Sequence, residues 1–229
     1  LVGPEAVGQS LVLDALLGCS SSSQLEGWTL GVSTRSVSWR AVVGGRQVTV
    51  VNTPDLLGSS LGVRERAWEA LRSLQLASPG PHAFLLLMQI PAPGRRMDAD
   101  AARTLRTLLN LIGEEALSYV LPVLTHTGSI KSSIVPSQLL EGLPGELEAM
   151  LSMCFHKPLV LSCGSQAKRR ALGSELLEKV EEMSALGGYY RHQLHREEDS
   201  FREKLLEDMA AALELKLEKK EELSATRWH

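Results

Sequence analysis

The first residues of the chain have the types and spacing of a loop that binds phosphate groups. Gly3 and Gly8 stand five positions apart, and the polar Gln9 and the hydroxyl residue Ser10 follow. Glycines let backbone N–H groups turn toward phosphate oxygens, and a helix that begins just after the loop adds the partial positive charge of its N-terminus. The Ser10 hydroxyl could also ligate a magnesium ion. The expected phosphate-binding residues are Gly3, Pro4, Glu5, Ala6, Val7, Gly8, Gln9, Ser10 and Leu11.

The loop lacks the lysine that such a motif usually carries, and Gln9 occupies that position. A lysine places a full positive charge against the outer phosphates, and a charge-assisted hydrogen bond contributes about 1.5–3 kcal/mol. Its absence predicts nucleotide binding that is roughly ten- to a hundred-fold weaker or more, with a larger loss of catalysis, where charge develops. On the pattern alone, a strand, turn and helix without any ligand is an equally good interpretation.

Buried strands alternate with amphipathic helices along most of the chain. The segments 37–40 and 47–51 have the residue types of strands and flank Gly44 and Gly45, which is typical of a hairpin with a two-glycine turn. Further strands are expected at 83–90, 119–125 and 158–162, and helices from residue 10 and at 64–76, 98–111, 138–153 and 174–183. This alternation predicts a doubly wound α/β sheet, in which ligands lie at the carboxyl ends of the strands.

The composition excludes several classes of protein. The 229 residues include 24 Lys and Arg against 27 Asp and Glu, which excludes a strongly basic nucleic-acid binder. The longest apolar run, Ala83–Met88, is far shorter than the roughly 20 residues that cross a bilayer, so no transmembrane segment is expected. The three cysteines form an odd number without metal-ligand spacing, which favours a reducing compartment such as the cytoplasm over a disulfide-bonded scaffold.

Residues 187–229 form a C-terminal extension of different character. From Tyr189 to Glu222 the chain contains no proline or glycine and is dense in charge. Apolar residues recur every four positions along one face, at Phe201, Leu205, Met209, Leu213 and Leu217. This pattern predicts a long amphipathic helix that folds back on its own domain or pairs with a copy of itself as a coiled coil. Acidic residues outnumber basic ones on this helix, so an anionic membrane surface is a poor partner.

Three motifs occur in a characteristic order: the loop at 3–10, the segment Asn52-Thr53-Pro54-Asp55-Leu56, and the run Gly80-Pro81-His82-Ala83-Phe84-Leu85-Leu86-Leu87. Together they resemble the immunity-associated GTPases, the GIMAP family of septin-like G domains, over about residues 1–185. The resemblance implies a P-loop GTPase-like, three-layer α/β domain with a mainly parallel sheet over residues 1–186. Because the first strand of such a domain is longer than Leu1-Val2, the chain is expected to be a segment of a longer protein.

The resemblance assigns roles to residues at the phosphate and metal end of the site. Ser38 stands at the family's switch threonine and keeps a hydroxyl, so Ser10 and Ser38 are the implied magnesium ligands. Thr53 belongs to the family's Asp-Thr-Pro segment, in which Asn52 replaces the carboxylate that holds the magnesium shell through water. GTP or GDP with magnesium is therefore the implied ligand, and the replaced residues predict that it binds weakly.

Further residues correspond to the base-binding end and to a catalytic arginine of the family. The segment 125–130 stands at the guanine-reading motif without its acidic residue, and the position after Ser162 holds no asparagine. The implied nucleotide-binding residues at this end are His126, Thr127, Gly128 and Ser162. Gly94 and Arg95 resemble a family element whose arginine has been implicated in stimulating hydrolysis across a dimer, which makes Arg95 the catalytic candidate.

These substitutions lead to one main hypothesis and two alternatives. The main hypothesis is a GIMAP-type domain with eroded nucleotide motifs that works as a weakly binding or non-hydrolysing assembly and interaction module. It would bind like domains, as a homo- or hetero-oligomer, through its switch face or its C-terminal helix. One alternative is an active GTPase that hydrolyses GTP in a dimer with an arginine supplied by the partner. The other is a structural domain that binds no nucleotide.

Overall fold

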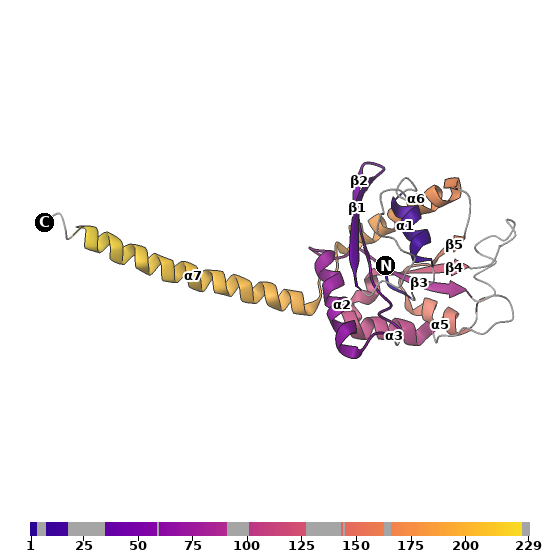
Figure 1. Cartoon of the computed structure of the whole chain (residues 1–229), viewed down its shortest axis with the longest axis horizontal. Coiled ribbons are helices and arrows are strands. Elements are labelled where there is room, and N and C mark those ends of the chain that lie inside the picture. Colours follow the sequence, from indigo (N-terminus) through magenta and orange to yellow (C-terminus); the bar gives the residue numbers. More distant parts are fainter. Residues whose placement is uncertain are drawn as a thin grey trace. The chain divides into compact units, whose positions relative to one another are not determined.

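A computed structural model of the chain describes residues 1–3, 8–17, 35–58, 60–90, 101–126, 143, 145–162 and 166–225. The chain divides into two compact units, residues 1–190 and 191–229. The first unit contains the sheet and most of the helices, and the second contains one long helix (Figure 1). The two units are described separately below.

A parallel sheet forms the centre of the first unit. Its strands are β3 (Phe84–Ile90), β4 (Val120–His126) and β5 (Leu159–Ser162), which lie side by side in that order. Phe84 lies opposite Val120, and Val123 lies opposite Leu159. These strands are almost continuously apolar because parallel strands at the middle of a domain are buried on both faces.

A β-hairpin forms a second, antiparallel sheet in the same unit. Strands β1 (Val37–Val43) and β2 (Arg46–Asn52) pair so that Val43 lies opposite Arg46. Gly44 and Gly45 form the turn between them, and both have positive φ, at 58° and 81°. A two-residue turn with positive φ at both positions matches the twist of the flanking strands, and glycine adopts it without steric cost. The predicted hairpin and its two-glycine turn are therefore confirmed.

Leu1 and Val2 join the hairpin to the parallel sheet. The Val2 N–H donates to the Leu85 carbonyl oxygen at 3.0 Å, and the Leu87 N–H donates to the Val2 carbonyl oxygen at 2.8 Å. On the other side, the Thr53 N–H donates to the Leu1 carbonyl oxygen at 3.2 Å. The backbone of these two residues thus lies between β2 and β3, and the two sheets form one layer.

Helices cover both faces of the sheet, as Figure 1 shows. Leu85 and Leu87 belong to one hydrophobic core, with residues of α1 (Gln9–Leu17) and α6 (Gln166–Gly187). Their neighbours Leu86 and Met88 belong to the opposite core, with residues of α2 (Val63–Leu76), α3 (Ala101–Ile112) and α5 (Gly145–Met153). Successive side chains of β3 therefore enter opposite layers. This arrangement confirms the three-layer, P-loop GTPase-like α/β fold predicted from the sequence.

Helices α1 and α6 approach each other closely on one face. A Cβ atom added to Gly173 of α6 would lie 1.9 Å from the carbonyl oxygen of Ala15 in α1. Real side chains cannot approach a backbone oxygen so closely, so only glycine permits this helix spacing. The sequence pattern predicts a helix from Ser174, whereas α6 begins at Gln166 and runs through Gly173. Gly173 is a packing residue inside the helix.

Tyr190 closes the first unit after α6. Its ring lies 5.4 Å from that of Phe84 and 5.6 Å from that of Tyr119, which ends the short helix η1 (Glu114–Tyr119). Its hydroxyl donates to the carbonyl oxygen of Ile112, and its N–H donates to the carbonyl oxygen of Pro81 at 2.8 Å. Helix α6 ends before Tyr190, at Gly187, where Gly188 has a φ of +68°, and the next helix begins at Gln193.

The second unit consists of α7 (Gln193–Ala225) and the residues beside it. Ion pairs join Arg191 to Asp199 and Arg202 to Glu198 along the helix surface. Within the part of α7 whose side chains are described, the apolar residues Phe201 and Met209 are exposed. No helix in the described ranges combines the length and the apolar character needed to cross a bilayer.

Candidate functional site

The two glycines of the predicted phosphate loop lie against the ends of the central strands. A Cβ atom on Gly3 would lie 2.7 Å from the carbonyl oxygen of Leu87 in β3. A Cβ atom on Gly8 would lie 2.4 Å from Cγ2 of Thr125 in β4, and Gly8 has a φ of +75°. Both positions therefore require glycine, one for close approach and one also for its backbone conformation. The residues between them, 4–7, lie outside the described part of the chain.

Gln9, the first residue of α1, points its side chain into the protein. Its amide nitrogen Nε2 lies 3.5 Å from the carbonyl oxygen of Gly3 and 3.4 Å from that of Thr53. Its amide oxygen Oε1 accepts a hydrogen bond from Asn52 Nδ2 at 3.0 Å. Gln9 and Asn52 are both buried. The two residues that stand in place of a lysine and an aspartate thus bond to each other.

These contacts fix the orientation of both amides. The end of Gln9 that faces two carbonyl oxygens must be the NH2 group, because an oxygen there would find no donor. Its oxygen then faces Asn52, which must present Nδ2. Asn52 Oδ1 is left enclosed and without a hydrogen-bond partner among the described residues. The Gln9–Asn52 amide pair is therefore internally bonded, uncharged and open at one acceptor.

The residues that follow Asn52 use their polar groups inside the protein. The Thr53 hydroxyl donates to the carbonyl oxygen of Leu1 at 3.0 Å. Asp55 Oδ1 accepts hydrogen bonds from the N–H groups of Leu57 at 3.1 Å and of Gly58 at 2.8 Å. The carboxylate thus stabilises the turn after β2. Thr53 is buried near Gln9, as predicted for a site residue, but its hydroxyl is held by backbone.

The two predicted magnesium ligands lie on different elements. Ser10 is exposed in the first turn of α1, and Ser38 is half-buried in β1, opposite Val51 of β2. Mg²⁺ prefers charged carboxylate oxygens, and Asn52 offers a neutral amide oxygen where the family has a carboxylate. No group of three His, Cys, Asp or Glu side chains that could hold a metal occurs among the described residues. These residues offer hydroxyls and a neutral amide but no carboxylate, and in that respect they fit magnesium poorly.

Sequence reasoning missed a link between β1 and α2. The N–H of Ser36, just before β1, donates to Glu69 Oε2 at 2.7 Å, and the Ser36 hydroxyl donates to the Glu69 carbonyl oxygen at 3.3 Å. Both residues are buried. The pair spans 33 positions of sequence, and no motif or periodic pattern marks either residue. We call this contact the Ser36–Glu69 link.

The two segments expected to bind the base end at the same edge of the sheet. His126, the last residue of β4, lies opposite Ser162, the last residue of β5. Beside them, the buried Thr125 hydroxyl donates to the carbonyl oxygen of Met88 at 3.2 Å. Thr125 also contacts Gly8, so it connects this edge with the phosphate loop, a role the motif did not reveal. Thr127, Gly128 and Arg95 lie outside the described residues.

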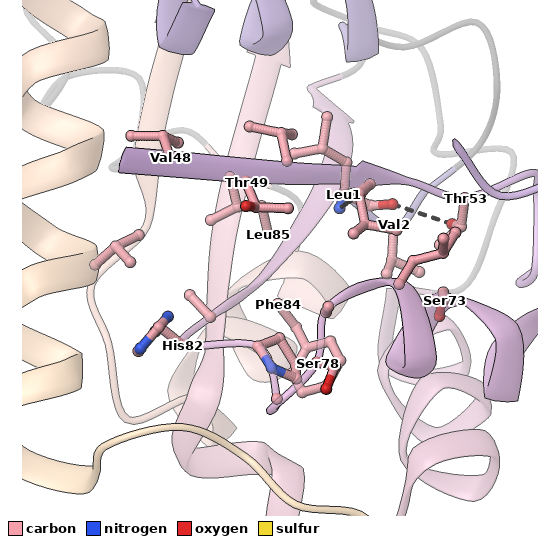
Figure 2. A pocket seen from close by; sticks show the side chains of 18 of the residues that line it. Leu1, Val2, Val48, Thr49, Thr53, Ser73, Ser78, His82, Phe84 and Leu85 are labelled. Atoms are coloured by element: carbon pink, nitrogen blue, oxygen red, sulfur yellow. Dashed lines mark hydrogen bonds between the residues drawn. The ribbon is translucent and has the colours of Figure 1, made fainter. Parts of the chain in front are cut away.

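A separate cavity of about 330 Å³ lies near the opposite end of the strands. Figure 2 shows Val48 and Thr49 of β2 on one side of it and Ser78 and His82 on the other. Leu177 of α6 and residues of α3 also line it, so the cavity crosses the sheet layer between the two helical layers. Gly8, Gln9 and Thr125 are not among its lining residues. It is a gap in the sheet layer, and among the described residues predicted for the site Thr53 lines it.

Cys154, which follows α5, is not set up as a nucleophile. Burial raises the pKa of its thiol to about 11, so the thiol stays protonated near neutral pH. Its sulfur contacts the carbonyl oxygen of Met150 at 3.7 Å. Nearby, His156 Nε2 lies 2.8 Å from the carbonyl oxygen of Ser118 and does not contact the thiol in any recorded hydrogen bond.

Solved structures with this fold come from Toc33 of Arabidopsis thaliana. The complex of Toc33 with Mg²⁺ and GMPPNP is 15% identical, with a TM-score of 0.57, over 82% of this chain and 84% of that one. The complex with GDP and Mg²⁺ is 17% identical, with the same TM-score, over 83% and 85%. At these identities the comparison establishes the fold, and it agrees with the layer order described above.

Sequence relatives agree with a family match that covers most of the chain. Immune-associated nucleotide-binding protein 3 of Arabidopsis thaliana is 25% identical over 205 residues, which are 86% of this chain and 60% of that protein. Immune-associated nucleotide-binding protein 7 is 32% identical over 128 residues, 55% of this chain and 39% of that protein. The chain thus spans less than two thirds of the length of each of these two relatives. Residues 1–209 match the AIG1 family, and the chain belongs to it.

Proposed function

We propose that this chain is a guanine-nucleotide-binding-like domain of the AIG1 family that works mainly as an assembly module, binding GTP or GDP weakly and hydrolysing GTP slowly or not at all. The single observation that carries the proposal is the hydrogen bond from Asn52 Nδ2 to Gln9 Oε1. It places a neutral pair, bonded within the protein, where the phosphate loop and the following motif ordinarily place a lysine and a carboxylate. The relatives' names, which describe nucleotide-binding proteins, support the ligand class.

The physical argument concerns charge in the transition state. Phosphoryl transfer depends on positive groups and metal ions that neutralise charge on the transferred phosphoryl oxygens. Gln9 contributes no charge, and both protons of its NH2 group face carbonyl oxygens of the protein. The site keeps Gly8 and the N-terminus of α1, and a helix N-terminus attracts an anion whether or not that anion is a transition state. Weak binding with little turnover is the expected result.

Assembly would use surfaces that remain intact when the nucleotide machinery is lost. One is the switch face, which we define as β1 and α2, where Trp68 is exposed. The other is α7, whose exposed apolar residues suit pairing with another helix. A Toc33 structure with this fold is described as an arginine-to-alanine mutant deficient in dimerization, which supports oligomerisation as a property to test. Like domains, and not nucleic acid, are the proposed partners, in the cytoplasm.

Calorimetric titration and a turnover assay test the proposal. With GTP or GDP and excess magnesium, we expect a dissociation constant no tighter than about 100 μM, given two replaced charged groups. We expect phosphate release at the buffer rate. Sedimentation velocity at increasing protein concentration should show self-association that does not depend on added nucleotide. Micromolar affinity together with measurable turnover would contradict the proposal.

The alternative, an active GTPase, makes a different prediction for Arg95. The Gly94-Arg95 pair favours this alternative because it resembles a family element with an arginine that acts across a dimer. If Arg95 acts in this way, Arg95→Ala lowers turnover at high protein concentration by about 10³-fold, as arginine fingers do elsewhere. Arg95→Lys, which keeps the charge but not the planar fork, serves as the control. Equal phosphate release by all three proteins would reject the alternative.

A further inference from the structure

We propose that the Gln9–Asn52 amide pair makes phosphate binding at this site independent of magnesium. The inference rests on the proposed function, because it specifies how that site treats its ligand. It also explains why two substitutions 43 positions apart in sequence occur as bonded partners in the fold.

The first step is the hydrogen-bond inventory of Gln9. An uncharged glutamine side chain has two N–H donors and one acceptor oxygen. The donors face the carbonyl oxygens of Gly3 and Thr53, and the oxygen accepts from Asn52 Nδ2. Gln9 therefore has no free donor to extend toward a phosphate group, and it brings no charge. The outer phosphates lose the contact that a lysine would supply.

The second step is the charge balance of the pair. A lysine and a carboxylate together carry no net charge, and neither do two amides. Replacing only one member would leave an uncompensated charge in a buried place, which is strongly destabilising. Replacing both keeps the region neutral and keeps a direct side-chain hydrogen bond, at 3.0 Å. The two amides are therefore one structural unit, because each one avoids leaving an unpaired charge at the other position.

The third step concerns the metal. The family's carboxylate attracts magnesium with a full negative charge and holds water molecules of its shell. Asn52 Oδ1 is enclosed and neutral, and hydrogen bonds to charged acceptors are roughly twice as strong as those to neutral ones. Asp55, the nearest carboxylate along the chain, already accepts from the N–H groups of Leu57 and Gly58. Among the described residues at this end of the site, position 52 thus offers magnesium a neutral oxygen, and the Asp55 carboxylate is held in the turn through its Oδ1.

The fourth step is what the site retains for a phosphate. Gly8 keeps the tight contact with Thr125 that brings the loop close to the sheet, and α1 begins at the next residue. Backbone N–H groups at a helix start bind anions by dipole and hydrogen bond, and this interaction needs no metal. The attraction that remains is between the backbone N–H groups at the start of α1 and the phosphate oxygens. Binding should therefore be the same with or without magnesium.

The first experiment measures the affinity of the wild-type chain for a fluorescent guanine diphosphate, once in excess magnesium and once in excess EDTA. We expect the two dissociation constants to agree within about threefold, which is less than 1 kcal/mol. A dissociation constant that is tenfold or more weaker in EDTA would overturn the inference. This comparison requires no variant and so does not depend on how substitutions affect folding.

The second experiment restores the charges. The double variant Gln9→Lys with Asn52→Asp should bind the same probe at least tenfold more tightly in magnesium than in EDTA. Gln9→Lys alone serves as the matched control and should show no such difference, because it leaves a neutral amide at position 52 and restores no carboxylate for magnesium. A double variant with equal affinity in both buffers would count against the inference.

A third measurement separates this inference from the proposed function. If the wild-type chain binds no guanine nucleotide in either buffer, the binding part of the proposed function fails, while the double variant still tests the pair. Thermal unfolding of the wild-type chain without nucleotide then provides an independent readout. We expect the same unfolding temperature in magnesium and in EDTA, since a bound ion would stabilise the native state by mass action. A rise of several degrees in magnesium would refute magnesium independence.

Discussion

Replacing Gly173 with alanine should lower the free energy of unfolding by about 2 kcal/mol, the middle of the range for overpacked interiors. The added methyl group would lie 1.9 Å from the carbonyl oxygen of Ala15, and the obstructing atom is backbone. The contact can be relieved only if α1 and α6 move apart. That movement would disturb the core on this face of the sheet, where Val12 and Leu176 are fully buried. Urea denaturation followed by tryptophan fluorescence measures the loss.

Gly145 offers a matched control for this substitution. It is the first residue of α5, and a Cβ atom added to it would meet nothing within 4 Å. In that position alanine should be neutral or should stabilise the protein by up to about 1 kcal/mol, because glycine costs more conformational entropy on folding. Equal effects of Gly145→Ala and Gly173→Ala on the free energy of unfolding would show that helix propensity, and not the α1–α6 contact, determines the effect at each position.

Replacing Asn52 alone with aspartate should lower the free energy of unfolding by about 3 kcal/mol at neutral pH, as for other uncompensated buried charges. The new carboxylate would be enclosed and would face Gln9 Oε1, which carries a partial negative charge. Gln9 cannot turn its amide round without placing its oxygen against the carbonyl oxygens of Gly3 and Thr53. The Gln9 oxygen therefore stays directed at the new carboxylate, and the repulsion between them is not relieved by rotation of the amide.

Adding Gln9→Lys to this variant should recover a large part of the loss, with a coupling energy of about 1–3 kcal/mol. A lysine nitrogen can donate to the same carbonyl oxygens and to the new carboxylate. Gln47→Glu, on the exposed part of β2, controls for adding one negative charge to the strand and should change stability by no more than about 0.5 kcal/mol. Additive effects of the two substitutions at positions 9 and 52 would show that the amides do not act as a pair.

The layers of the fold could be predicted because they follow from local patterns. The apolar run ending at Ile90 has the composition of a strand buried on both faces, and the structure makes it β3, a buried strand of the parallel sheet beside β4. Gly44 and Gly45 specify a turn by their own conformational freedom. Gly173 shows where such reasoning stops. A glycine inside a helical pattern suggests a helix start, and only the position of Ala15 in space explains it as a packing residue.

The candidate site could be predicted only in part. Its glycines, Gln9 and Asn52 were evident from motif spacing, and each substitution could be interpreted separately as a loss. The bond between Gln9 and Asn52 could not be foreseen, because no local rule relates residues 43 positions apart. The start of α7 at Gln193 carries a local contact that the periodic pattern does not reveal: the N–H of Leu194 donates to His192 Nδ1 at 3.2 Å.

The Ser36–Glu69 link has a consequence for how a partner protein would meet this domain. Two hydrogen bonds tie the entrance of β1 to α2, and both involve backbone as well as side-chain atoms. The two elements of the switch face therefore hold a common geometry in the free chain. A partner that contacts both would meet a preorganised surface and would not have to order it on association, which favours affinity without enlarging the contact area. A partner would then recognise the shape that β1 and α2 already have in the free domain.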